Sequence, residues 1–78
     1  MNEYHVSAFW DDEVKVWVGI SEDVPGLCVE ACTLEELMQA AGELIPELLI
    51  LNGVLTRGDG NPVSFRLTAE RAAVVRAH

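Results

Sequence analysis

The chain has 78 residues, half of them hydrophobic, and a formal net charge of −8 at pH 7. We expect a single domain over residues 1–78, and a domain of this length buries only about 60% of the surface that its unfolded chain exposes. Five Lys and Arg residues stand against thirteen Asp and Glu, so the clustered cations that bind nucleic acid or anionic membranes are missing.

The first part of the chain holds most of the acidic residues. Residues 1–50 contain eleven Asp and Glu and one Lys, a net charge of −10, whereas residues 51–78 contain two acidic residues and four Arg, a net charge of +2. Opposite charges on two proteins speed their encounter and favour one partner over others. The acidic part therefore predicts either a basic partner or no partner at all.

The N-terminal residues have neither a basic region followed by an apolar one nor a long apolar run. A signal peptide needs the former, and a membrane-spanning helix needs about 18 consecutive apolar residues. We expect a cytoplasmic protein.

Two alternating segments predict a β-hairpin at the start of the chain. Tyr4–Trp10 and Val14–Ser21 alternate in the manner of strands, and the charged residues Asp11–Glu13 form a turn between them. In the second strand, Trp17 and Gly19 share one face. The opposite face is aliphatic, and we expect it to lie under a helix; it carries Val14, Val16, Val18 and Ile20.

A turn and a third strand follow. Pro25 presets its own φ and Gly26 can adopt a positive φ, a pair typical of a type II turn. The chain then alternates over Leu27–Ala31, with Cys28 and Glu30 on the face opposite Leu27, Val29 and Ala31.

Thr33 and Glu36 form a capping-box pattern that predicts the start of a helix. Pro46 interrupts this helix, so we expect either a kink or two shorter helices. Asn52 and Gly53 form a C-terminal stop pattern, so we expect the helix to end there. Residues with helical spacing form the apolar stripe: Leu34, Leu37, Met38, Ala41, Leu44, Ile45 and Leu48. The next apolar residues fall partly outside it, and we expect them at a dimer contact or under the following loop: Leu49, Ile50 and Leu51.

The remaining residues predict a fourth strand and a tail. Residues 56–62 are a polar, Gly-rich connection, Val63–Leu67 alternate again, and Thr68 can cap a short helix within residues 69–77. The predicted fold is α+β, with the order β-β-β-α-β, a three-stranded antiparallel meander and the helix on one sheet face. The surplus of apolar residues for so small a core predicts a surface for self-association or for a partner, and we expect a homodimer.

The sheet face without a helix is the predicted partner-binding surface. We place Phe9, Trp17, Cys28, Glu30 and Arg66 on it. Phe9 and Trp17 are candidate anchors, because aromatic side chains dominate interface energy, although both can instead pack under the C-terminal segment. The predicted partner-binding residues are Phe9, Trp17, Glu22, Asp23 and Glu30.

No motif of a phosphate loop, a hydrolase or a metalloprotease is present, so we expect no catalytic residue, cofactor or metal. Cys28 and Cys32, with His5 and His78, contain the atoms for a zinc site. Structural zinc sites use tighter paired spacing, however, so we interpret both cysteines as small hydrophobic residues.

An ordered set of segments resembles the HicB-like antitoxin superfamily, and in particular a branch of small bacterial proteins of unknown function. The resemblance covers residues 4–67 and leaves 68–78 as a tail. Its segments are Trp17-Val18-Gly19, Asp23-Val24-Pro25-Gly26-Leu27, Glu30-Ala31, Thr33-Leu34-Glu35-Glu36-Leu37 and Ile45-Pro46-Glu47-Leu48-Leu49.

The resemblance implies a HicB-like, partial ribonuclease H-like fold and an acidic antitoxin that masks a small basic ribonuclease toxin. HicB proteins usually continue into a DNA-binding domain, but only eleven residues follow Leu67 here. Ribonuclease H chemistry needs a carboxylate in the first strand, which Tyr4–Phe9 lacks. The alternative function is a stand-alone homodimeric structural or sensing domain without a toxin.

Overall fold

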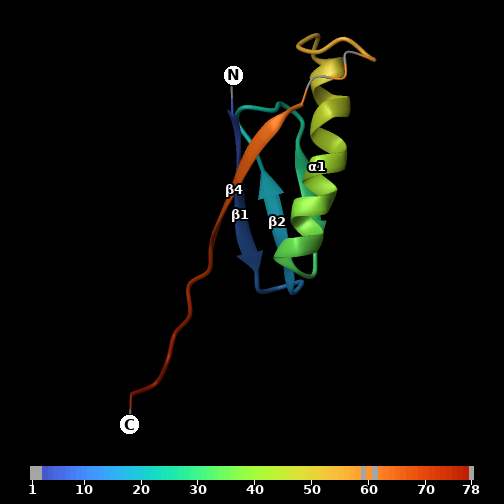
Figure 1. Cartoon of the computed structure of the whole chain (residues 1–78). Helices are drawn as coiled ribbons and strands as arrows, with labels where there is room; N and C mark the ends of the chain where they lie inside the picture. Colours follow the sequence, from blue (N-terminus) through green and yellow to red (C-terminus); the bar gives the residue numbers. More distant parts are fainter. Residues whose placement is uncertain (1–2, 59, 61, 78) are drawn as a thin grey trace.

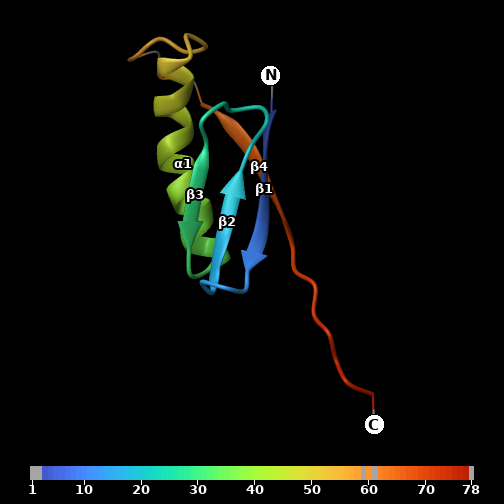
Figure 2. The ribbon, with the colours of Figure 1, turned by 180° about the vertical axis from the view of Figure 1, so that it is seen from behind.

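The structure is a computed structural model that describes residues 3–58, 60 and 62–77. It confirms the α+β class and the predicted order of elements: one helix packs on one face of a sheet (Figures 1 and 2). The elements are β1 (Glu3–Asp11), β2 (Val16–Ile20), β3 (Cys28–Ala31), α1 (Leu34–Leu51) and β4 (Ser64–Glu70).

The sheet is mixed, with the strand order β3-β2-β1-β4. β1, β2 and β3 form the predicted antiparallel meander, in which Phe9 lies opposite Val18 and Val18 opposite Glu30. β4 pairs with β1 in parallel, with Leu67 opposite Val6. A parallel pair needs a crossover connection, and α1 supplies it by running back along the sheet. As a result, the chain's first and last strands are neighbours.

Thr33 caps the helix as predicted: its hydroxyl accepts a hydrogen bond from the backbone N–H of Glu36 at 3.1 Å. The helix continues through Pro46 to Leu51, so the alternative of two shorter helices is wrong. Proline has no N–H to donate to the carbonyl of Gly42, which removes one helical hydrogen bond. Burial on both sides of this position, at Ile45 and Leu49, keeps the helix on the sheet.

The core lies between α1 and the sheet. Its helical part is a stripe at intervals of four residues, formed by Leu37, Ala41, Ile45 and Leu49. The prediction that Leu49 lies in a dimer contact is wrong, because its side chain is 1% exposed and packs in the core. Leu51, by contrast, is 78% exposed.

The turn before β3 has the predicted geometry and contributes to the core. Gly26 has a φ of +90°, and the N–H of Leu27 donates to the carbonyl of Val24 at 3.1 Å. The turn folds Val24 inward, where it is completely buried with Leu27. The Nδ2 group of Asn52 donates to the carbonyl of Pro25 at 3.3 Å, so the end of α1 also holds this turn.

The predicted faces of β2 are reversed. A Cβ atom on Gly19 would lie 3.0 Å from Cγ2 of Val29 and 3.5 Å from Cδ2 of Leu37, so Gly19 faces the helix. By alternation Trp17 also lies on the helix side, and Val16, Val18 and Ile20 lie on the opposite face. The nearest neighbour of such a Cβ atom is the Val29 side chain on β3, so a side chain at Gly19 would press on Val29 and lie against Leu37.

The predicted C-terminal helix is absent. Thr68 and Ala69 continue β4, and residues 71–77, which we call the C-terminal arm, form neither helix nor strand. The arm leaves the sheet at the end where β1 turns into β2 and extends away from the body (Figure 1). A two-turn helix here would be marginal without a surface on which to dock.

No helix among the described residues is both long and apolar enough to cross a membrane.

The close packing over Gly19 predicts a large effect of adding a side chain there. Gly19→Val should lower the free energy of unfolding by about 2 kcal/mol, because it overpacks the space between Val29 and Leu37. Urea unfolding followed by circular dichroism measures this change. Ile20→Val on the opposite face should change the free energy little, and equal stability of both variants would contradict the reversed faces of β2.

Candidate protein-binding face

The face of the sheet that α1 does not cover is the main candidate site, and we call it the open face. Val6 and Ala8 point from β1 into the buried side, so the alternating residues His5, Ser7 and Phe9 point outward. The strand registers place further side chains on the same face. These are Val16, Val18 and Ile20 from β2, Cys28 and Glu30 from β3, and Glu3, Ser64, Arg66, Thr68 and Glu70 from β1 and β4.

An apolar strip crosses the middle of the open face. Phe9 lies directly opposite Val18 on the neighbouring strand, and Ile20 lies two residues further along β2. Val18 is buried, whereas Phe9 and Ile20 are 43% and 44% exposed. An exposed aromatic ring beside an aliphatic side chain, on a surface without a covering helix, is typical of a protein contact.

Carboxylates surround this apolar strip. Glu30 lies opposite Val18 on β3, Glu70 lies opposite Phe9 on β4, and Glu3 lies at the start of β1. Arg66 is the cation among the strand residues assigned to this face, and its Nε atom pairs with Oε1 of Glu3 at 3.0 Å. The open face is therefore apolar at its centre and acidic at its margin.

The loop between β2 and β3 adds two more carboxylates to the same surface. Oδ2 of Asp23 accepts a hydrogen bond from the backbone N–H of His5 at 2.8 Å, so the loop is held against the start of β1. The hydroxyl of Ser21 donates to the carbonyl of His5 at 2.6 Å and accepts from the N–H groups of Asp23 and Val24. A shallow hollow results, lined by His5, Ser7, Ile20, Glu22 and Asp23.

The structure thus brings four of the five predicted partner-binding residues to one surface. Phe9 and Glu30 lie on the open face, and Glu22 and Asp23 border it. The sequence did not indicate that Ser21 holds the loop or that Nε2 of His5 lies 2.7 Å from the hydroxyl of Thr68. These contacts join residues that are far apart in the chain. The contact between His5 and Thr68 forms only because β4 pairs with β1 in parallel.

Trp17, the fifth predicted residue, lies on the other side of the sheet. It is opposite Trp10, and the two rings meet edge to face with their centroids 5.5 Å apart. The prediction that Trp17 shares the uncovered face with Phe9 is therefore wrong. The physical reason is the register of β2, which places Gly19 opposite the buried Ala8 and so turns the odd-numbered residues of β2 toward α1.

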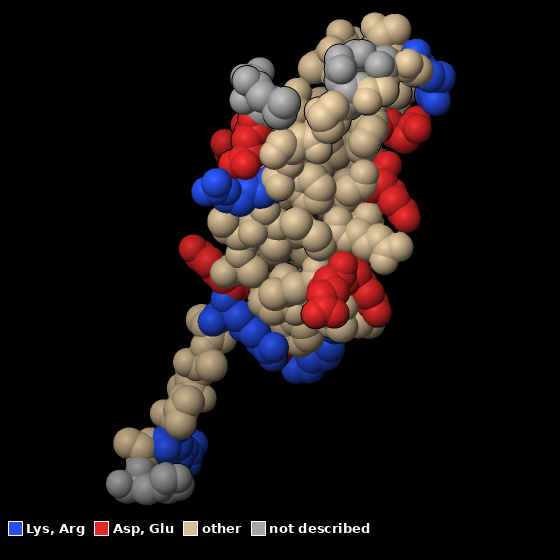
Figure 3. Space-filling view, in the orientation of Figure 1, with Lys and Arg blue, Asp and Glu red and all other residues tan. Residues whose placement is uncertain are grey.

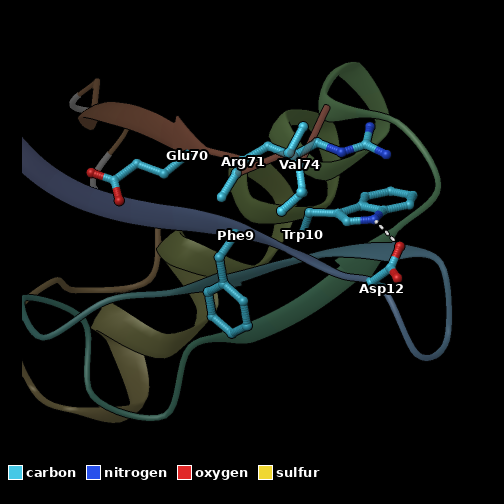
Figure 4. Close-up of a pocket in the computed structure, with 8 residues that line it drawn as sticks. Phe9, Trp10, Asp12, Glu70, Arg71 and Val74 are labelled. Carbon is cyan, nitrogen blue, oxygen red and sulfur yellow. Dashed lines mark hydrogen bonds between the residues drawn. The ribbon is translucent and has the colours of Figure 1, made fainter. Parts of the chain in front are cut away.

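A second hollow lies where the C-terminal arm leaves the sheet (Figure 4). Phe9 and Trp10 point to opposite sides of β1, and the guanidinium carbon of Arg71 lies 4.1 Å from the centre of the Trp10 ring. Such a cation–π contact holds the beginning of the arm against the body. Glu70 and Val74 also line this hollow.

The Asp12 carboxylate connects the hairpin turn to this aromatic cluster. Its Oδ1 atom accepts hydrogen bonds from Nζ of Lys15 at 2.8 Å and from the Trp10 indole at 3.2 Å. These two bonds, with the charge of Lys15, lower the pKa of Asp12 below its ordinary value. A lowered pKa means that the contact stabilises the fold above the unfolded-state pKa and is lost as the pH falls through the folded-state pKa.

We predict that Lys15→Gln raises the pKa of Asp12 toward its ordinary value, because it removes the largest cause of the shift. Two-dimensional NMR titration of the side-chain carboxylates between neutral and acidic pH measures this pKa directly. Arg57→Gln serves as the matched control, since Arg57 pairs with Glu47 instead. If both variants left the pKa of Asp12 unchanged, Lys15 would not be its cause.

Both cysteines are free and exposed. Cys28 lies on the open face opposite Ile20, and Cys32 follows β3. Within residues 3–58, 60 and 62–77, no group of three or more His, Cys, Asp or Glu residues is placed to hold a metal ion. His78, the fourth member of the zinc set considered from the sequence, lies outside the described residues.

Comparisons with known proteins give a family and a fold. A domain of unknown function, DUF1902, matches residues 3–78. The crystal structure of a hypothetical protein from the extremely thermophilic bacterium Thermus thermophilus is similar, with 47% sequence identity and a TM-score of 0.77. The match covers 95% of this chain and all of that chain. No curated protein sequence gives a significant match.

Proposed function

The chain belongs to the DUF1902 family, and from its open face we propose that it is a non-enzymatic binding module that neutralises a small basic toxin. The proposal places it with the HicB-like antitoxins that several of its sequence segments resemble. Neutralisation would take place in the cytoplasm by protein–protein contact, without a cofactor.

The open face is the observation that carries this proposal. Its exposed apolar centre, Phe9 and Ile20, offers surface that a partner can remove from water. Its acidic margin, Glu22, Asp23 and Glu30, selects a partner of opposite charge. An apolar centre within a polar rim is the usual arrangement of a specific protein interface.

The net charge supports the same class of partner. At −8 for 78 residues, the chain repels polyanions and attracts cationic proteins over several ångströms. Ribonuclease toxins must bind RNA and are therefore basic, so an acidic protein that covers their cationic surface competes directly with their substrate. Inhibition would follow from binding alone.

Co-expression tests the toxin partnership. The tagged chain is expressed with each small open reading frame from its genomic neighbourhood and then purified. We expect one small basic protein to co-purify, its growth arrest to be relieved by this chain, and the affinity to fall as salt rises. The proposal would be overturned if no neighbouring protein co-purified with this chain and none was neutralised by it.

Point variants test whether the open face is the contact. Phe9→Ser and Glu30→Lys should each weaken toxin binding about tenfold or more, because one removes the exposed aromatic anchor and the other reverses a charge at the rim. Isothermal titration calorimetry with the purified toxin measures the dissociation constants.

The chain offers matched controls away from this face. Val54→Ser changes another exposed apolar residue in the loop after α1, and Glu43→Lys reverses an exposed charge on the helix. Both should bind like the unaltered chain. Equal losses in the open-face variants and the controls would show that the toxin docks elsewhere or responds only to net charge.

A further inference from the structure

The C-terminal arm is apolar and basic, yet it contacts little of its own body. Val74 is fully exposed, at 102% of the reference value, and Val75 is nearly so. Arg71 anchors the beginning of the arm over Trp10, and beyond it the chain remains extended. The exposure of two adjacent valine side chains to water is unfavourable, and docking on a partner would bury them.

The arm continues the long edge of the sheet. β3 and β4 are the two edge strands; β3 has four residues, whereas β4 has seven. Proteins commonly protect a sheet edge by keeping the edge strand short, as at β3, because unpaired N–H and C=O groups recruit further strands. β4 and the arm leave a long edge of backbone groups open to another strand.

Charge indicates which chain pairs with this edge. The arm carries Arg71 and Arg76, and its basic end stands apart from the acidic body (Figure 3). Glu70 at the end of β4 stands six residues before Arg76, so this segment carries both signs of charge and is complementary to itself when two copies run antiparallel. A second copy of this chain is the partner that fits.

We propose that the arm and the end of β4 pair, as antiparallel strands, with the same segment of a second copy. Two copies related by a two-fold axis through Ala73 place Glu70 of each copy opposite Arg76 of the other. Axes through Glu70 or Arg71 would instead place two like charges opposite each other, which is unfavourable. The resulting dimer has one sheet continuous across both copies.

This pairing leaves the open face available. The two-fold axis of two antiparallel strands in one sheet is perpendicular to the sheet, so both helices lie on one side and both open faces on the other. The inference does not rest on the toxin partnership, because the dimer forms through the strand edge and the arm, and Glu70 is the one residue of the proposed charge pairs that also lies on the open face.

Sedimentation equilibrium of the full chain over a concentration series tests the dimer. We expect Arg76→Glu to raise the dissociation constant of the dimer about fivefold, since symmetry removes two cross-strand charge pairs. Glu70→Arg combined with Arg76→Glu should restore it, because the pairs are reversed and not lost. Arg57→Glu, in the loop outside the arm, is the control and should have no such effect.

Cysteine cross-linking tests the register. Ala73→Cys should give a disulfide-linked dimer on oxidation, both in the native background and when Cys28 and Cys32 are replaced by Ser. Cross-linking of the new cysteine to Cys28 would instead place the arm on the open face of the second copy and overturn the proposal. A chain that remains monomeric at every concentration, or a double variant no stronger than Arg76→Glu, would also overturn it.

Discussion

A single helix covers a sheet that has two faces, and this constraint shapes the whole molecule. α1 buries its stripe of Leu37, Ala41, Ile45 and Leu49 against one face. The described chain has no second helix for the other face, so Phe9 and Ile20 stay exposed there. In a domain of this length the core is small, and the uncovered apolar surface becomes available for binding.

The acidic residues explain how such a surface can remain in water. Carboxylates from three strands and from the loop after β2 surround the exposed aromatic ring, and Ser21 and Asp23 hold that loop in place through hydrogen bonds to His5. Charge of one sign keeps copies of the open face from associating with one another. The same charge would favour the basic partner proposed above, so one physical property underlies both the exposure of this face and the proposed contact.

The periodic patterns in the sequence predicted most of the secondary structure. Alternation located the four strands, Thr33 marked the start of the helix, and Pro25-Gly26 marked the turn before β3. The faces of β2 were predicted wrongly, because Val16, Val18 and Ile20 form the more hydrophobic side of that strand. Packing around Gly19 decided otherwise: this position lies between Val29 of β3 and Leu37 of α1, and a glycine leaves room for both side chains.

The sequence by itself determined the order of elements, the acidic character and the excess of apolar residues over what one small core can bury, since these depend on local periodicity and composition. Tertiary structure alone decided which side of β2 faces the helix, that Leu49 belongs to the core, and that residues 71–77 extend as an arm instead of forming a helix. The reason is that each of these depends on contacts between residues far apart in the chain. Trp10 meets Arg71, and Gly19 meets Leu37, only after β4 has paired with β1 and α1 has crossed the sheet.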